Sequence, residues 1–226
     1  MKLSLKPAVA ALVLAAPMVA FGAEFEIDSA HSSANFAVKH MMVSTVRGSF
    51  GKTTGKINID EKDITKSTVE AVIDATTINT NEPKRDEHLR APDFFDVAKY
   101  PTITFKSTKV EKAGENLKVM GDLTMHGVTK PVTLTAEGFT TESKDPWGNI
   151  KRGGVATTKI NRKDFGLTYN AALETGGVAV GEEVSITLDL ELNKKKEAAG
   201  AAAAPAAKPA TPAAPAKPAA KGTGTK

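Results

Sequence analysis

Four histidines, at positions 31, 40, 88 and 126, are the residues of this chain best suited to acid–base chemistry or metal binding. No two of them have the spacing of a metal-binding pair, and Asp86-Glu87-His88 lacks the second histidine of a zinc-protease helix. No set of nucleophile, base and orienting group can be assembled from the serines and histidines without knowledge of the fold. The sequence therefore predicts a protein that is not an enzyme and that uses no metal or cofactor.

Two further fragments resemble functional motifs but are incomplete. Gly51-Lys52-Thr53 matches the end of a phosphate-binding loop, whereas Val46 stands where that loop has its first glycine. In Arg47-Gly48-Ser49 the glycine directly precedes the serine, instead of standing two residues before it as in a nucleophile elbow. The chain also contains no cysteine, which excludes disulfides, thiol nucleophiles, thiolate metal sites and lipid attachment through a cysteine.

The elements that position these residues are predicted to be strands, because apolar and polar residues alternate from Ala23 to Asn193. The clearest strand has an apolar face formed by Val184, Ile186, Leu188, Leu190 and Leu192. The same period recurs at 34–38, 69–75, 103–105, 117–125 and 132–136, and glycine-interrupted strands are expected around 46–60 and 152–163. The pattern predicts an all-β fold of about eight antiparallel strands, as a closed barrel or, alternatively, a sandwich.

One helical insertion is predicted near 83–91. Asn81 is a candidate cap, Pro83 suits the first turn, and Asp86 and Arg90 have the spacing of an i,i+4 ion pair. The insertion carries Leu89, Phe94 and Phe95. We expect it to cover one end of a barrel, either as a plug that completes the core or as a lid over a cavity.

Both ends of the chain are predicted to lie outside the folded domain, which spans 23–193. Residues 1–22 combine two lysines with a short apolar run and the small-residue pattern Ala20-Phe21-Gly22, which predicts a signal peptide cleaved after Gly22 or Ala23. The mature protein is therefore expected in the periplasm or an equivalent space. Residues 194–226 consist almost wholly of Ala, Pro, Lys, Gly and Thr, and recurrent prolines predict a disordered tail.

The charge of the chain is distributed unevenly between these segments. The whole chain has 30 basic and 26 acidic residues, but residues 1–22 hold two of the lysines, and 194–226 hold seven lysines against one acid. The domain from 23 to 193 is thus left with 21 basic and 25 acidic residues. The basic balance belongs to the ends, so nucleic acid is not a predicted partner, whereas the tail could contact anionic envelope surfaces.

A set of motifs, in order along the chain, resembles the YceI-like family across residues 24–192. They are Phe25-Glu26-Ile27-Asp28, Phe36-Ala37-Val38-Lys39-His40, Val46-Arg47-Gly48-Ser49-Phe50, Asp93-Phe94-Phe95-Asp96-Val97, Gly121-Asp122-Leu123-Thr124 and Asp164-Phe165-Gly166. The resemblance implies an extended, lipocalin-like antiparallel eight-stranded barrel that holds a polyisoprenoid lipid, such as a polyprenyl quinone, in its interior. The tail lies outside the family pattern.

The predicted ligand-binding residues are those of suitable type in inward register or at the covering insertion. Those along the tunnel are Phe36, Val38, Phe50, Ile73, Phe105, Leu123, Met125, Leu134 and Ile186; those at the lid are Leu89, Phe94 and Phe95. His40 continues the inward register of its strand, and with Arg162 it is a candidate for the polar end. For every residue the alternative is an ordinary structural role, which for Arg162 would be a salt bridge or turn contact with Asp164 or another acid.

Two other functions remain open from the sequence. The first is an envelope enzyme that acts on a prenyl substrate with His40 as acid or base, and the second is a scaffold that works through the basic tail. A homodimer is compatible with a barrel of this kind, although no residue argues for one.

Overall fold

The computed structural model describes residues 22–174 and 176–196. Its strands are β1 (Ala23–Ile27), β2 (Ser33–His40), β3 (Ser44–Phe50), β4 (Thr53–Ile59), β5 (Thr68–Asp74), β6 (Ile78–Asn79), β7 (Thr102–Ala113), β8 (Asn116–Met125), β9 (Val128–Gly138), β10 (Ser143–Lys144), β11 (Ile150–Asn161) and β12 (Val180–Lys194). The helical elements are α1 (Pro83–Arg90) and the 3-10 turns η1 (Ile64–Lys66), η2 (Ala75–Thr77) and η3 (Arg162–Phe165). Nearly all of the predicted signal peptide and tail lies outside the described residues.

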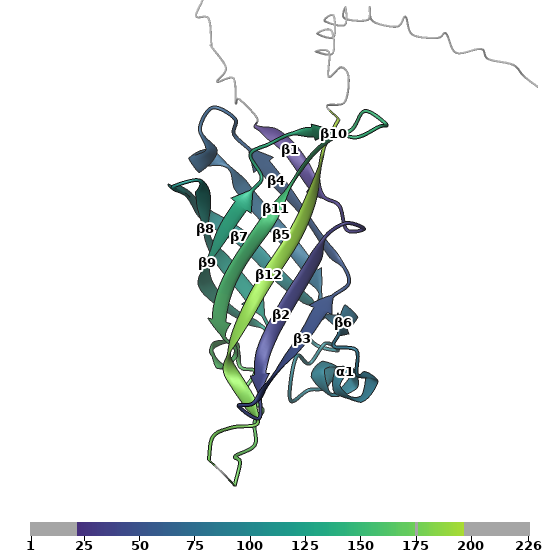
Figure 1. Cartoon of the computed structure of the whole chain (residues 1–226), viewed down its shortest axis with the longest axis vertical. Coiled ribbons are helices and arrows are strands. Elements are labelled where there is room, and N and C mark those ends of the chain that lie inside the picture. The colour runs from purple at the N-terminus through teal and green to yellow at the C-terminus, as the bar shows by residue number, and fades with distance from the viewer. Residues whose placement is uncertain (1–21, 175, 197–226) are drawn as a thin grey trace, which may run out of the picture. The chain divides into compact units, whose positions relative to one another are not determined.

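The strands form one antiparallel sheet that closes on itself (Figure 1). β12 pairs with β11 along one edge, and its other edge pairs with β2 over 180–189 and with β1 over 192–194. β1 and β2 therefore occupy one strand position in two pieces. The same holds for β3 with β4, and for β5 with β6, because each pair continues along the same neighbouring strands. Counted in this way the barrel has eight strand positions, which confirms the predicted closed barrel and excludes the sandwich.

Local sequence explains why the strands turn and pair as they do. In the β8–β9 hairpin, Met125 pairs with Val128 around a two-residue loop in which His126 and Gly127 both have positive φ. Such a loop has the backbone twist that antiparallel strands require, and glycine adopts it without steric cost. Gly121 in β8 is needed for another reason, since a Cβ there would lie 2.5 Å from the Lys106 carbonyl oxygen and 2.5 Å from the Phe105 ring.

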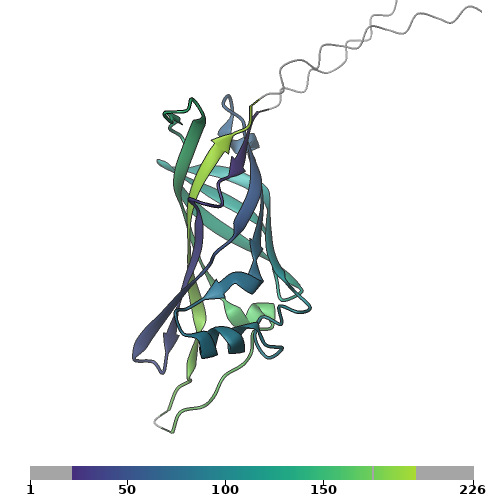
Figure 2. The ribbon, with the colours of Figure 1, turned by 90° about the vertical axis from the view of Figure 1, so that its right-hand side faces the viewer.

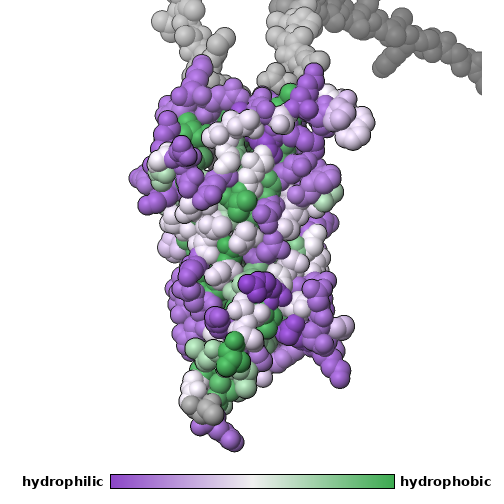
Figure 3. Space-filling view, in the orientation of Figure 1, coloured by the Kyte–Doolittle hydropathy of each residue, from purple (hydrophilic) through white to green (hydrophobic). Residues whose placement is uncertain are grey.

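The alternation along each strand separates an apolar interior from a polar exterior. In β12 the even-numbered residues from Val184 to Leu192 face inward, and Leu192 is fully buried. Figure 3 shows hydrophilic residues along both sides of the face in view, with paler and some hydrophobic residues between them. Among the described residues, no helix is long and apolar enough to cross a membrane.

The helix α1 lies at the lower end of the barrel, away from the start of β1 and the end of β12 (Figures 1 and 2). Pro83 occupies the first turn as predicted, but the cap is Glu82, whose carboxylate accepts a hydrogen bond from the Lys84 N–H. The predicted Asp86–Arg90 ion pair is wrong. Asp86 is buried against the preceding turn, where it accepts hydrogen bonds from Thr80, and Arg90 donates to the carbonyl oxygens of residues 76 and 78. These contacts attach the helix to β6 because its polar residues find backbone and turn partners nearer than each other.

Candidate functional site

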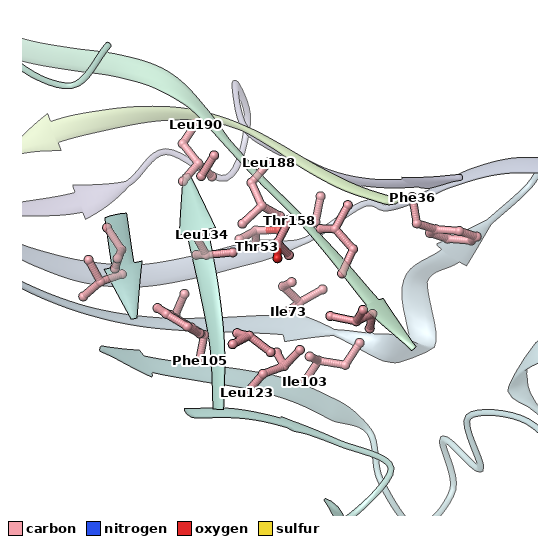
Figure 4. A pocket seen from close by; sticks show the side chains of 18 of the residues that line it. Phe36, Thr53, Ile73, Ile103, Phe105, Leu123, Leu134, Thr158, Leu188 and Leu190 are labelled. Atoms are coloured by element: carbon pink, nitrogen blue, oxygen red, sulfur yellow. The ribbon is translucent and has the colours of Figure 1, made fainter. Parts of the chain in front are cut away.

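An apolar cavity of about 230 Å³ lies inside the barrel (Figure 4). Its lining extends from Ile59 and Ile64 near one end of the barrel to Phe94 and Leu167 near the other. The volume is below the ~300–1,000 Å³ of common small-molecule pockets. A small volume spread along the length of a barrel describes a narrow channel, which suits an extended apolar chain better than a compact molecule.

Thirteen of the fourteen predicted site residues lie on the wall of this cavity. They are Phe36, Val38, Phe50, Ile73, Leu89, Phe94, Phe95, Phe105, Leu123, Met125, Leu134, Arg162 and Ile186. The strand register accounts for this placement, because successive inward side chains of every strand meet in the interior of a closed sheet. Contact of these residues with a ligand remains a prediction.

His40 is the exception, and its predicted position at the inward polar end is wrong. It is exposed at the end of β2, where it pairs with Ser44 of β3 and Val180 of β12, and it is not part of the cavity wall. The β2–β3 hairpin extends past the end of the barrel core, so side chains still alternate between the two faces of β2 at a point where neither face is buried. The enzyme hypothesis thereby loses its proposed acid or base.

Arg162 lies at the lower end of the cavity, but each nitrogen of its guanidinium already has a backbone partner. It is 4% exposed and donates to the carbonyl oxygens of Gly181 (2.8 Å), Val180 (3.2 Å) and Leu167. Burial lowers the pKa of this guanidinium from its ordinary value. Arg162 thus has the alternative structural role, but the predicted acidic partner is wrong, since backbone carbonyls and not Asp164 bond to all three nitrogens. Arg162 fixes the chain between η3 and β12 and thus closes this end.

The segment that follows α1 covers the same end with aromatic side chains. The Phe95 ring meets that of Phe50 edge-on at 5.7 Å between centroids, and the Phe94 ring lies 4.8 Å from Tyr169 and 4.9 Å from His88. Leu89, Phe94 and Phe95 line the cavity, and Leu89 and Phe95 also pack against the core of the barrel, so the insertion forms the floor of the cavity.

At the upper end the apolar cavity adjoins a polar depression. Ile59, Ile64 and Leu117 line both, so they mark the boundary between them. The other residues of the depression include Asp60, Glu61, Lys112, Glu115, Glu142 and Arg152. Arg152 donates to Glu61 at 3.2 Å and to Glu142 at 3.1 Å, and its guanidinium lies 5.1 Å from the centroid of the Phe25 ring. This end is the candidate mouth of the cavity.

A second polar cluster lies on the outside of the barrel, where the β1–β2 loop meets β11 and β12. Asp28 accepts hydrogen bonds from His31 (3.0 Å), Asn193 (3.1 Å) and Lys151 (3.4 Å), and Lys151 also pairs with Glu191. The hydrogen bond from His31 is the largest cause that holds the pKa of Asp28 well below its usual range, and the same contact raises the pKa of His31. Three potential metal ligands meet here, but the Lys151 ammonium already bonds to both carboxylates, so the cluster is interpreted as a structural tie.

The predicted set of ligand-binding residues leaves out a large part of the cavity wall, although some of the omitted residues, such as Leu188 and Leu190, lie on faces predicted to be apolar. The missed residues include Ile27, Thr53, Ile57, Ile59, Val119, Ile160, Leu188 and Leu190. Alternation within 53–59 was a usable signal, because Thr53, Ile57 and Ile59 share one register and all are buried. The strand expected around 46–60 includes Thr53, but residue type alone does not mark a threonine as part of an apolar wall.

Comparison with known proteins agrees with this architecture. Residues 25–192 match the model of the YceI-like domain. A UPF0312 protein of Vibrio parahaemolyticus is 44% identical over 170 residues, which cover 74% of this chain and 89% of that protein. The crystal structure of a Campylobacter jejuni YceI protein is similar with a TM-score of 0.59 and 31% identity, over 70% of this chain and 90% of that one.

A more distant neighbour shares the fold. It is a polyisoprenoid-binding domain from Saccharophagus degradans, with a TM-score of 0.55 and 20% identity, over 76% of this chain and 98% of that one. The family assignment rests on the domain match and the closer relatives, which cover most of the barrel. By this similarity, which extends over 25–192, the chain belongs to the YceI-like family.

Proposed function

We propose that this protein binds a long-chain polyisoprenoid lipid, such as a polyprenyl quinone, inside its barrel, and that it does so in the periplasm after export. The main support for this proposal is the narrow apolar cavity. Among the described residues that line it, Arg162 is the one with a charged side chain. The polyisoprenoid-binding domain of Saccharophagus degradans, which shares the fold, supports this choice of ligand class. The signal-peptide pattern of residues 1–22 supports the proposed location.

The energetics of burial favour a long chain. Each methylene taken from water into an apolar site contributes ~0.8 kcal/mol, so ten enclosed carbons contribute roughly 8 kcal/mol before costs. Association itself costs at least several kcal/mol. A short apolar molecule would therefore bind weakly in this cavity, whereas a polyisoprenoid has enough carbons to exceed the cost without many polar contacts.

Extraction tests the proposal directly. Protein purified from the periplasmic fraction without strong detergent should release a prenyl lipid into organic solvent, identified by mass spectrometry. Delipidated protein should then take up a polyprenyl quinone from vesicles. Protein that is empty on isolation and takes up no prenyl lipid would contradict the proposal.

A pair of variants on β2 locates the binding. Phe36→Asp places a charge on the cavity wall and should abolish lipid uptake, because a carboxylate in an apolar channel opposes burial of the chain. Ala37→Asp places the same charge on the next residue, which does not line the cavity, and should leave uptake intact. Circular dichroism of both variants checks that each is folded. Unchanged uptake by folded Phe36→Asp protein would remove Phe36 from the site.

A further inference from the structure

The hydroxyl of Thr53 is a buried polar group without a partner on the wall of the apolar cavity. Thr53 begins β4 and is 2% exposed, and its Oγ1 makes no hydrogen bond. Figure 4 shows its side chain among Ile73, Thr158 and Leu188, away from the ring of Phe36. Proteins nearly always satisfy buried hydroxyls, because an unpaired one loses its bonds to water and gains nothing in return. The hydroxyl therefore needs a partner that enters the cavity.

Most of the other polar side chains around the cavity already have partners, and Thr104, the exception, is only partly buried. The Thr158 hydroxyl donates to the Thr133 carbonyl at 2.8 Å, the Ser67 hydroxyl accepts from the Asp60 N–H at 3.0 Å, and the Arg162 guanidinium is held by backbone carbonyls. Among the residues that the structure describes, Thr53 has the one buried and unpartnered polar atom on this wall. Thr53 is therefore the buried group on this wall whose hydrogen-bonding capacity is left entirely for a ligand.

The charges around the channel disfavour an anionic ligand head. The depression at the mouth is lined by four acids (Asp60, Glu61, Glu115 and Glu142) against two bases, Lys112 and Arg152. Arg152 is paired with two of those acids, so it adds little free positive charge. Phosphate groups bind where cationic donors are available. The mouth has no surplus of them, and Arg162, the one cation on the cavity wall, already donates to three backbone carbonyls.

We propose that Thr53 anchors an uncharged oxygen of the bound lipid inside the barrel, so that the protein selects prenyl lipids with a neutral oxygenated head, such as a quinone, over prenyl phosphates and over pure hydrocarbons. This inference rests on the proposed lipid-binding function. The Thr53 Oγ–H donates to the carbonyl or hydroxyl oxygen of the head, which then lies within the channel and not in the depression at its mouth. The apolar chain occupies the remaining length.

The test compares three probes on the wild type and two variants at position 53. The probes are a polyprenyl quinone, an oxygen-free polyprene and a polyprenyl phosphate, all with the same number of isoprene units. Thr53→Val removes the hydroxyl at nearly constant volume, and Thr53→Ser keeps the hydroxyl but removes a methyl group. Affinities are measured by partition from neutral vesicles, and thermal unfolding of each lipid-free variant is recorded alongside.

We expect the wild type to bind the quinone about tenfold more tightly than the polyprene, the scale of one buried hydrogen bond. The preference should disappear in Thr53→Val and persist in Thr53→Ser, while the polyprene binds both variants about as well as the wild type. The lipid-free Thr53→Val protein should unfold at the same temperature as the lipid-free wild type or at a higher one, because the Thr53 hydroxyl that it lacks makes no hydrogen bond in the wild type.

Several results would overturn this inference. The first is equal affinity of the wild type for the quinone and the polyprene, as expected if only water bonds to Thr53. The second is a quinone preference that persists in Thr53→Val, and the third is a lower unfolding temperature of that variant. The fourth is binding of the polyprenyl phosphate as tightly as the quinone. Binding of the polyprene without a quinone preference contradicts the Thr53 anchor but leaves the lipid-binding function standing. Binding of none of the three probes to the wild type contradicts both.

Discussion

Filling the channel from its own wall should stabilise the empty protein and weaken lipid binding at the same time. Ala136 in β9 is 7% exposed and lines the cavity, with Ala156 beside it on β11 and Leu117 beside it on β8. Ala136→Leu adds three carbons next to an open volume of about 230 Å³. Because the space exists already, the added side chain need not displace its neighbours.

The two effects can be estimated from the same burial energy. Three buried carbons contribute about 2.4 kcal/mol, and fixing a leucine side chain costs about 0.5–1 kcal/mol, so the lipid-free variant should gain about 1.5 kcal/mol. A lipid that loses three carbons of channel to the new side chain binds about 2.4 kcal/mol less favourably, which is about 50-fold in affinity. Stability and affinity therefore change in opposite directions.

Thermal and denaturant unfolding of delipidated protein measures the first effect, and partition of a polyprenyl quinone from vesicles measures the second. Thr133→Leu is the matched control, because Thr133 is exposed on the same strand and does not line the cavity. An Ala136→Leu protein that binds lipid within threefold of this control would refute the assignment of the channel as the binding site. Loss of stability would instead refute the estimate of free volume at position 136.

Three further predictions concern residues that hold the barrel together. Gly121→Ala should lower the stability by about 1–3 kcal/mol in denaturant unfolding, because its Cβ would overlap the Phe105 ring and a carbonyl oxygen, whereas Gly51→Ala, at an open position, should cost far less. The pKa of Asp28 is lowered in the folded state, so the stability that its carboxylate contributes is present at neutral pH and is lost as the pH falls below about 4. Asp28→Asn should therefore lower the unfolding temperature at pH 7 and make that temperature less dependent on pH below about 4. An unfolding temperature that falls with acid as steeply in the variant as in the wild type would contradict this role of Asp28. Arg162→Lys should cost roughly 1–3 kcal/mol, because an ammonium group cannot reach all three carbonyls, and equal stability of the two proteins would show that these bonds are dispensable.

Much of the barrel could be predicted from the sequence because strand faces are a local property. Successive side chains point to opposite sides of a strand, so the alternation in 184–192 identified the inward residues of β12 before its neighbours were known. The glycines at 48, 51 and 55 likewise marked the region where β3 ends and β4 begins. The same reasoning placed Phe36, Ile73 and Leu134 on the cavity wall.

The predictions that failed depend on where a local pattern lies in the whole molecule. The alternation that led from Phe36 through Val38 to His40 continues past the point where the barrel encloses anything, so His40 is exposed. The spacing of Asp86 and Arg90 permits an ion pair, but each finds backbone or hydroxyl partners outside the helix. Neighbours distant in sequence, which a periodic pattern cannot specify, decide both outcomes.

The sequence by itself determined an all-β chain with an apolar face on most strands and predicted an acidic folded domain flanked by basic ends. Only the tertiary structure decided that those faces enclose a narrow open channel, because the unfilled volume depends on how side chains from all eight strand positions meet. It also decided that Arg162 is held by carbonyls while Thr53 has no partner. Residue type shows which groups can form hydrogen bonds, but only the closed barrel shows which of them are left free for a ligand.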